Sequence, residues 1–413
     1  MSDIIFRRKD CRLCGGNRLE LALPLAASPI GDAFIPESKL NDFQDRYPLD
    51  IFLCGDCGHV QLLDVIDPKI LYNDYIYTTT SSPGLPEHFK TYADEVLSRV
   101  ELSKGSLAVD IGSNDGTLLK EFQTRGLKVL GVEPARVIAE KATASGVETL
   151  PSFFNAEMAE KIRDKHGLAS LVTTNNLFAN VDDLVNLVSN IRSLLADDGV
   201  FIIETGYLVD LVRNTIFDNV YHEHLGYHSV EPLRNFLAET GLEMIHAARV
   251  PSKGGSLRAT IQLEGGPRPV DSSVDQFVRQ EQSIGAHSIE TYQTMAKKLK
   301  GIKSQLAQLV EDIKGQGKTV AGYGASQSGT TLMYHFGLQD SLNFIVDDNP
   351  VKQGLFSPGC HIPVLPSAEL ETQKPDYVIT LAWRFSKSMI GQHQQYRDSG
   401  GKFIVPLPDV EVV

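Results

Sequence analysis

The sequence has little of what would place a protein in a membrane, in an oxidising compartment or on nucleic acid. No apolar run is long enough to cross a bilayer, and the polar stretch Met1 to Asp10 lacks the apolar core of a signal peptide. Five cysteines among 413 residues are too few for a disulfide framework. The net charge of −13 argues against nucleic acid or an anionic membrane as a partner. We therefore expect a cytoplasmic protein. The sequence leaves its oligomeric state open and is compatible with a monomer.

The composition is otherwise that of an ordinary globular protein, with 42% hydrophobic and 22% charged residues. A typical domain has about 100–150 residues, so a chain of 413 residues should contain more than one. The patterns described below divide the sequence into three parts, which are residues 1–70, 71–284 and 285–413.

Four of the five cysteines form two C-x-x-C pairs, Cys11 with Cys14 and Cys54 with Cys57. Glycines follow both pairs and let the backbone turn tightly around a metal ion. Four thiolates suit Zn²⁺ in a closed tetrahedral site, which is structural rather than catalytic. The alternative is a set of reduced, buried thiols. The spacing favours a small zinc-binding domain that depends on its metal to fold.

Strands alternate with helices between residues 106 and 203. The apolar run Leu107 to Ile111 precedes a glycine-rich turn and a helical stretch that begins at Thr117. A second strand, Val129 to Val132, ends at an acidic residue. This alternation predicts a parallel, doubly wound sheet, in which ligands sit beyond the carboxyl ends of the strands.

The glycine-rich turn reads Asp110-Ile-Gly-Ser-Asn-Asp-Gly116. In NAD sites such a turn faces a pyrophosphate. In S-adenosylmethionine sites it faces the amino-acid tail of the cofactor, and the spacing of acid and glycines favours this ligand. NAD and a turn without any ligand remain as alternatives. The acid at the end of the second strand, Glu133, can accept both hydroxyl hydrogens of a ribose.

Two further strands, Leu242 to Val250 and Ser256 to Leu263, are expected to form an antiparallel hairpin at the edge of the sheet. With the glycine-rich turn, this arrangement resembles the class I S-adenosylmethionine-dependent methyltransferases. The resemblance implies a set of cofactor contacts at the tail, the ribose, the adenine and one wall of the site: Asp110, Gly112, Asn114, Gly116, Glu133, Phe153 and Asn176.

The C-terminal part begins with a helical stretch, residues 286–314, whose apolar stripe predicts a helix that bridges two domains. A strand and a second glycine-rich turn follow between Lys318 and Ser326, and later strands are expected at 343–346, 377–382 and 402–405. This is a Rossmann-like α/β domain. A glycine turn at a helix N-terminus binds phosphate readily. A nucleotide diphosphate is favoured over NAD because one cofactor is already assigned to the central domain. The alternative is a purely structural domain.

Three histidines fall within nine residues, from Val220 to His228. A metal site would need a third ligand beside His222 and His224, and the helical H-E-x-x-H pattern is absent. A solvated polar loop is the second interpretation. The third is proton transfer, because histidine exchanges a proton near neutral pH, a carboxylate orients it, and tyrosines stabilise a developing oxyanion.

The zinc-binding segment, the central methyltransferase, the C-terminal domain and the run Tyr221-His-Glu-His224 together resemble the sugar-nucleotide C-methyltransferases. The likeness covers essentially the whole chain and includes the stretches 347–354 and 358–364. It implies methylation at carbon 3 of a nucleotide-linked 4-keto-6-deoxy sugar through an enolate, with His224 as the base. It also implies that Glu223, Tyr221 and Tyr77 take part in catalysis beside His224. The substrate contacts that it implies are Asn180, Lys253, Arg258, Tyr323 and Ser326.

The sequence departs from that family at several positions. Asn180 stands where the family often has histidine, and Arg384 stands where asparagine is more common. Asparagine can hydrogen-bond a sugar hydroxyl but cannot exchange a proton. Two other functions are therefore kept as alternatives: an O-methyltransferase acting on a sugar nucleotide, and a non-catalytic zinc-scaffolded protein that binds nucleotide sugars.

Overall fold

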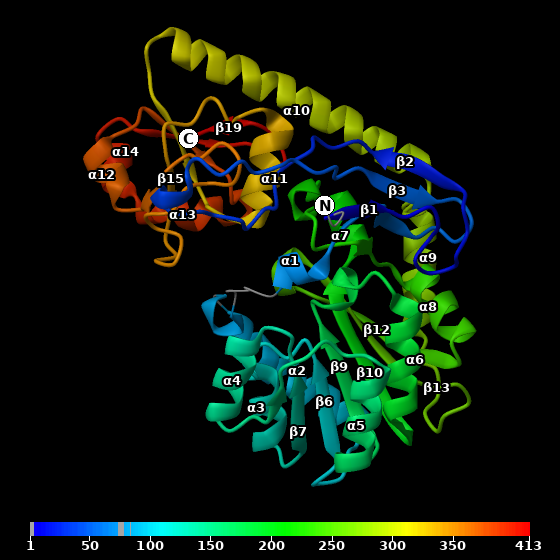
Figure 1. The fold of residues 1–413 in the computed structure, drawn as a ribbon. Coiled ribbons are helices and arrows are strands. Elements are labelled where there is room, and N and C mark those ends of the chain that lie inside the picture. The colour runs from blue at the N-terminus through cyan, green and yellow to red at the C-terminus, as the bar shows by residue number, and fades with distance from the viewer. Residues whose placement is uncertain (1–3, 73–77, 83) are drawn as a thin grey trace.

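The computed structural model describes residues 4–72, 78–82 and 84–413 (Figure 1). Tyr77, expected at the active site, and its neighbour Tyr75 lie outside the described residues. Within the described ranges, none of the helices combines the length and the apolar character needed to cross a bilayer. The larger part of the molecule consists of two α/β units, with the N-terminal strands beside them (Figure 1).

The central sheet has seven strands in the order β12-β13-β10-β9-β6-β7-β8. In chain order this is 3-2-1-4-5-7-6, and all neighbours pair in parallel except β13, which is antiparallel to both β10 and β12. The predicted doubly wound sheet and its closing hairpin are confirmed. The strand bounds are β6 Leu107–Ile111, β7 Lys128–Val132, β8 Thr149–Leu150, β9 Ala169–Asn175, β10 Leu195–Gly206, β12 Leu242–Val250 and β13 Ser256–Leu263.

Helices cover both faces of this sheet because successive strand residues point to opposite sides. Val200 and Ile202 of β10 pack with α2 and α3, whereas Phe201 and Ile203 pack in the core that includes α5, α6, α8 and α9. The helix α2 was not predicted. The helix bounds are α2 Leu85–Val100, α3 Thr117–Thr124, α4 Arg136–Ala144, α5 Ala156–His166, α6 Leu184–Leu194, α7 Leu208–Arg213, α8 Val230–Glu239 and α9 Ser273–Ser283.

The N-terminal strands form a small sheet in the order β11-β4-β3-β2, beside the separate pair β1–β5. One member comes from elsewhere in the chain: β11 (Gly226–Tyr227) belongs to the histidine-rich stretch and pairs with β4. The zinc-binding segment therefore supports that stretch directly. The remaining bounds are β1 Ile5–Arg7, β2 Leu19–Leu23, β3 Ile51–Cys54, β4 Val60–Leu62, β5 Asp64–Ile66 and α1 Pro68–Tyr72.

The C-terminal sheet has the order β16-β15-β14-β17-β18-β19, which is 3-2-1-4-5-6 in chain order and agrees with the predicted Rossmann-like domain. Its strands are parallel except β19, which pairs antiparallel to β18. The bounds are β14 Val320–Tyr323, β15 Ile345–Asp347, β16 Val364–Pro366, β17 Tyr377–Thr380, β18 Lys402–Val405, β19 Glu411–Val412, α11 Gln327–Phe336, α12 Glu369–Gln373, α13 Ser386–Gln392 and α14 Gln394–Asp398.

The N-terminal segment reaches the C-terminal domain as well as the zinc-binding sheet. Ile35 forms a β-bridge with Phe356, and the Thr330 hydroxyl donates to the Gly31 carbonyl oxygen at 2.9 Å. Lys352 forms an ion pair with Asp32. Residues from the two ends of the sequence therefore pack together in one unit.

A single long helix, α10 (Ile289–Gly315), runs along the outside of the molecule (Figure 1). Its buried side chains join a core that contains residues of the N-terminal strands and of the C-terminal domain, as the predicted bridging role requires. The apolar stripe predicted from the sequence is Met295, Leu299, Ile302, Leu306, Leu309 and Ile313. The observed buried stripe adds Tyr292 and has Val310 in place of Leu309, which lies at the edge.

We expect Leu306→Ala to lower the free energy of unfolding by about 2–5 kcal/mol, because it removes a fully buried side chain from this shared core. Thermal unfolding followed by circular dichroism measures the effect. Lys298→Ala, on the exposed side of the same helix, should change it by no more than about 0.5 kcal/mol. Equal unfolding midpoints for the two variants would contradict a bridging role for α10.

Candidate active site

A cavity of about 1430 Å³ lies between the domains and is lined by residues of all three parts of the chain. Asp32 comes from the N-terminal segment, Gly112 and His224 from the central part, and Ser326 from the C-terminal domain. Pockets for one small molecule usually measure about 300–1,000 Å³, so this volume can hold two ligands side by side.

The wall nearest the central sheet is the glycine-rich turn after β6. Gly112 has φ +74°, and a Cβ there would lie 3.3 Å from the Leu177 side chain, so glycine suits this position. The Glu133 carboxylate, at the end of β7, accepts the backbone N–H groups of Asn114 at 3.0 Å and Ala135 at 2.8 Å. Burial raises the pKa of Glu133. These bonds hold the turn against the end of the second strand.

Asp110 is buried below this turn. Its Oδ1 accepts hydrogen bonds from the Thr173 hydroxyl at 2.6 Å and from the Asn175 amide at 3.3 Å. Burial raises the pKa of Asp110 to about 7, although both hydrogen bonds favour the charged form. Asp110 therefore lies ready to accept a hydrogen bond from a cationic ligand group, such as the ammonium of an amino-acid tail.

The residues around this wall fit S-adenosylmethionine. Each Glu133 oxygen receives one backbone N–H and keeps a lone pair that can accept a ribose hydroxyl. Phe153 is partly exposed at the rim, where it can cover an adenine ring. Gly116 is the N-cap of α3 and does not line the cavity. The predicted cofactor residues that do line it are Asp110, Gly112, Asn114, Glu133, Phe153 and Asn176.

The opposite wall contains the histidine loop, which we define as residues 217–228. His224 Nδ1 lies 3.0 Å from the carbonyl oxygen of Asn219, which can only accept, so Nδ1 carries the proton. Nε2 is then the acceptor and receives a hydrogen bond from the Tyr221 hydroxyl at 2.9 Å. Burial, together with the charges of Lys253 and Arg384, lowers the pKa of His224 to about 4. The imidazole is therefore neutral at physiological pH, with its basic nitrogen beside a phenol.

Glu223 has a different environment from the one expected. The sequence suggested that its carboxylate orients the neighbouring histidine, but its Oε1 accepts a hydrogen bond from the Gln327 amide of the C-terminal domain. Successive residues in the loop point to different partners, and a backbone carbonyl takes the orienting role instead. Burial, followed by the charge of Asp32, raises the pKa of Glu223 to about 8. Glu223 is therefore mostly protonated at neutral pH and can donate a hydrogen bond.

The zinc-binding sheet holds one side of the histidine loop. Gly226 and Tyr227 form β11 on the edge of β4, and the Leu62 N–H donates to the Leu225 carbonyl oxygen at 3.0 Å. His222 Nε2 donates to the Tyr47 carbonyl oxygen at 3.2 Å, and the ring of His228 stacks on that of His59 with centroids 5.3 Å apart. Two of the three clustered histidines therefore support the loop, and only the third faces the cavity.

The C-terminal domain holds the other side of the loop. The Thr331 hydroxyl donates to the Val220 carbonyl oxygen at 2.7 Å. The ring of Phe217 packs against Phe336 and His335, with centroids 5.2 Å and 4.9 Å away. The loop thus depends on contacts with both flanking parts of the chain.

Three of the five predicted substrate contacts, Asn180, Lys253 and Ser326, line the cavity. Asn180 Oδ1 is buried and has no hydrogen-bond donor among the described residues, so a substrate hydroxyl could serve as its partner. Arg258 and Tyr323 do not line the cavity.

Arg258 and Tyr323 are engaged elsewhere. Arg258 Nε donates to the buried Glu204 carboxylate at 2.7 Å, and its guanidinium lies over the ring of Tyr92 at 4.1 Å. The Tyr323 hydroxyl donates to Asp348 at 2.9 Å. In both cases the polar group that was predicted to contact the substrate forms its hydrogen bond with a residue distant in the sequence instead.

Other cavity residues were missed by sequence reasoning. His88 contacts Glu204 at 2.6 Å from α2, a helix that was not predicted. Tyr72 lies near Asn180 and Glu223, and burial raises its pKa well above 10, so it remains a neutral phenol. Tyr72 begins the tyrosine-rich run Tyr72-Asn-Asp-Tyr-Ile-Tyr77, which is the only sequence signal that could have indicated it.

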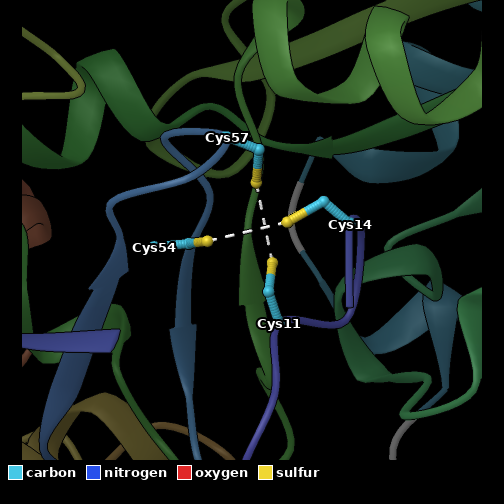
Figure 2. Close-up of side chains that lie close together, drawn as sticks. All are labelled: Cys11, Cys14, Cys54 and Cys57. Atoms are coloured by element: carbon cyan, nitrogen blue, oxygen red, sulfur yellow. Dashed lines mark hydrogen bonds between the residues drawn. The ribbon is translucent and has the colours of Figure 1, made fainter. Parts of the chain in front are cut away.

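The four N-terminal cysteines point their sulfur atoms toward one centre (Figure 2). The sulfurs lie within 4.8 Å of one another, with Cys11 3.6 Å from Cys57 and Cys14 3.7 Å from Cys54. A tetrahedron with Zn–S bonds of about 2.3 Å has sulfurs about 3.8 Å apart, so the set fits zinc. Among the described residues, this is the one group placed to hold a metal ion, and the histidine loop provides none.

The glycine after the second cysteine pair shows how closely this site approaches the central domain. Gly58 has φ +80°, and a Cβ there would lie 2.8 Å from the ring of His287, which precedes α10 and is hydrogen-bonded to the Ser229 hydroxyl of the central domain. Its N–H donates to the Cys54 carbonyl oxygen at 2.8 Å, which closes the turn around the metal site. The metal site and the central domain therefore pack directly against each other.

Three family models match successive parts of the chain: a zinc binding domain at residues 11–72, a methyltransferase domain at 87–247 and a C-methyltransferase C-terminal domain at 251–408. Among curated proteins, C-methyltransferase NovU of Streptomyces niveus is 32% identical over 414 residues, which is 100% of this chain and 99% of that protein.

Two solved structures are similar to a little under half of the chain. Magnesium protoporphyrin IX methyltransferase of Synechocystis PCC 6803 with bound SAM is 13% identical with a TM-score of 0.34, and covers 48% of this chain and 88% of its own. The PH0226 protein of Pyrococcus horikoshii OT3 is 14% identical with a TM-score of 0.37, and covers 46% of this chain and 95% of its own. Neither likeness supports a conclusion about function.

We expect Cys54→Ser to release zinc and to loosen the histidine loop, because β4 follows this ligand and pairs with β11. Zinc content by plasma mass spectrometry should fall, and amide hydrogen exchange across residues 220–228 should rise. Cys360→Ser is the matched control, because Cys360 lies near Ser357 and away from the metal site. Unchanged exchange in a zinc-free protein would contradict this support.

Proposed function

Because this chain belongs to the S-adenosylmethionine-dependent C-methyltransferases, we propose that it methylates carbon 3 of a nucleotide-linked 4-keto-6-deoxy sugar. The observation that carries the proposal is the shared cavity. A neutral imidazole, a phenol and a protonated carboxyl on the histidine loop face the same space as the glycine-rich turn of the central domain. Methylating carbon next to a ketone needs this combination, because the carbon must first lose a proton and the carbonyl must accept the charge.

In this proposal His224 Nε2 is the final acceptor of the carbon-3 proton. The hydrogen bond from Nδ1 to Asn219 keeps the ring in the tautomer that leaves Nε2 basic. In the structure Nε2 already accepts a hydrogen bond from the Tyr221 hydroxyl. The carbon-3 proton therefore reaches Nε2 either after the phenol turns aside or by relay, in which the phenol gives its proton to Nε2 and its oxygen takes the proton from carbon. When bound, S-adenosylmethionine supplies the electrophilic methyl group, which the residues around Gly112 and Glu133 would position.

The charge that develops on the 4-keto oxygen needs hydrogen-bond donors that remain protonated. Glu223 is such a donor at neutral pH because burial raises its pKa to about 8. A carboxyl held neutral in a buried site can stabilise an enolate in this way. Tyr77, whose position lies outside the described residues, remains a candidate for a second donor.

Contacts for the nucleotide sugar would come from both sides of the cavity. Asn180 can accept a hydrogen bond from a sugar hydroxyl, and the Lys253 ammonium complements a diphosphate. Ser326 caps α11 at the glycine-rich turn of the C-terminal domain, where its hydroxyl accepts the Gly329 N–H at 3.1 Å. Asp347 already accepts the Ala325 N–H at 2.6 Å, so this turn offers fewer free donors than an open phosphate cradle.

We expect deuterium to enter carbon 3 of a 4-keto sugar nucleotide when the protein is incubated with it in D₂O without S-adenosylmethionine. His224→Ala should slow this exchange and the methyl transfer by about 10²–10⁴-fold, because it removes the base. Mass spectrometry of dTDP- and GDP-linked 4-keto sugars measures both.

His166→Ala is the control for that experiment, since His166 lies on α5 and does not line the cavity. Methylation of a sugar without a keto group, with no deuterium exchange, would support O-methylation instead. Binding without any gain of methyl mass would support a non-catalytic role.

We expect kcat to fall as pH rises through about 8, because Glu223 ionises there and can no longer donate. On the acid side, kcat should fall only toward pH 4, where His224 becomes protonated and stops accepting. Glu223→Gln should abolish the alkaline fall, since an amide keeps N–H donors and does not titrate. Glu311→Gln, on the exposed side of α10, should leave the pH profile unchanged. An alkaline fall retained in Glu223→Gln would exclude this role.

A further inference from the structure

Arg384 of the C-terminal domain reaches across the cavity to the histidine loop. It lies in the short turn Trp383–Phe385 that follows β17, beside the carboxyl end of that strand. Its Nη1 donates to the side-chain oxygen of Asn219 at 2.9 Å, and the Arg384 side chain is only 22% exposed. Arg384 thus lies at the ligand-facing edge of the C-terminal domain and contacts the histidine loop of the central domain, which carries His224.

Asn219 connects Arg384 to the imidazole of His224 through two hydrogen bonds. Its side chain receives the hydrogen bond from Arg384, and its backbone carbonyl accepts the Nδ1 proton of His224 at 3.0 Å. Asn219 lies in a short 3-10 turn, Phe217–Asn219, which has little regular backbone bonding to orient that carbonyl. A continuous series of hydrogen bonds therefore runs from Arg384 through Asn219 and His224 to Tyr221.

A buried carboxylate provides a second anchor for the guanidinium. Asp218 is 1% exposed, and its Oδ2 lies 3.9 Å from Arg384 Nη2. Burial raises the pKa of Asp218, while Arg384 acts in the opposite direction by favouring the charged form. Because two consecutive loop residues engage one guanidinium, Arg384 restrains both the position and the rotation of this turn.

We propose that Arg384 is a positioning residue that sets the orientation of His224 through Asn219 and so makes the base depend on docking of the C-terminal domain. The inference rests on the role of His224 in the proposed function. It assigns Arg384 no contact with the reacting atoms. The base is in place only when the arginine holds the turn, so ordering of the C-terminal domain and readiness for proton transfer are coupled.

The charged and titratable groups that act on His224 come from several elements. Tyr221 lies in the same loop, Lys253 comes from the hairpin between β12 and β13, Arg384 comes from the C-terminal domain, and His228 lies against the zinc-binding sheet. Lys253 and Arg384 both lower the pKa of His224. Loss of the Arg384 charge should therefore raise the pKa, whereas weakening the bond to the Asn219 carbonyl should lower it, because that bond raises the pKa.

The test uses the full chain labelled with ¹⁵N-histidine, without any substrate. The ring signals of His224, assigned by their absence in His224→Ala, report the tautomer and the pKa directly. We expect Arg384→Ala to raise the pKa above about 4 and to weaken the preference for the Nδ1–H tautomer. Arg384→Lys should keep the low pKa, because the charge is retained. Asn219→Ala should weaken the tautomer preference and lower the pKa, because the bond to the Asn219 carbonyl favours the charged imidazole.

Turnover provides the second measurement. A misplaced catalytic group can cost about 10²-fold in rate, and we expect this fall in kcat for both Arg384→Ala and Asn219→Ala, with the KM for S-adenosylmethionine unchanged. The double variant should be no slower than the slower single variant, because both act through one series of bonds. Arg397→Gln, which removes an arginine from α14 in the same domain, is the matched control.

The outcomes separate this proposal from the proposed function. If the wild-type protein methylates no 4-keto sugar, the proposed function fails, while the ¹⁵N titration still decides the role of Arg384. If the tautomer and the pKa of His224 are the same in Arg384→Ala and in the wild-type protein, the positioning role is overturned, whatever the turnover shows. Additive losses in the double variant would also contradict it.

Discussion

The support of the histidine loop from two sides is the constraint on which the rest of the site depends. The loop forms one two-residue strand and one short turn, too little regular structure to hold an imidazole by itself. The edge of β4 pairs with it on one side, and Thr331, Gln327 and Arg384 bond to it on the other. The zinc-binding sheet and the C-terminal domain, both remote from the loop in sequence, therefore determine the geometry of His224.

Burial also sets the proton positions at the site. The low-dielectric cavity wall disfavours every charge, so it keeps the histidine neutral and the neighbouring glutamate protonated. In water at neutral pH the glutamate would be ionised and a fraction of the histidine would be protonated. One physical effect thus provides a hydrogen-bond acceptor and a hydrogen-bond donor on adjacent residues. The two groups do not neutralise each other because they face different partners.

Local sequence patterns were sufficient for the fold, because they depend on residues close together in the chain. The cysteine pairs and the hairpin strands β12 and β13 were predicted with their observed bounds. Side-chain directions were not predictable in the same way. Arg258 follows a glycine-rich hairpin and looked like a ligand contact, but Glu204, 54 residues earlier, takes its guanidinium. The helix α2 was missed although Leu85, Phe89, Tyr92, Val96 and Val100 recur at helical spacing in the sequence, so here the local signal was present.

The packing of the N-terminal segment against the C-terminal domain has a consequence for synthesis on the ribosome. Asp32 and Lys352 are 320 residues apart. At about 5–20 residues per second, the partner is made roughly 16 to 64 s after the segment that awaits it. The first part of the chain to leave the ribosome therefore completes its packing last. During that interval the apolar side chains of the N-terminal segment need a chaperone or temporary contacts. Truncation of the C-terminal domain would likewise destabilise the packing of the N-terminal segment.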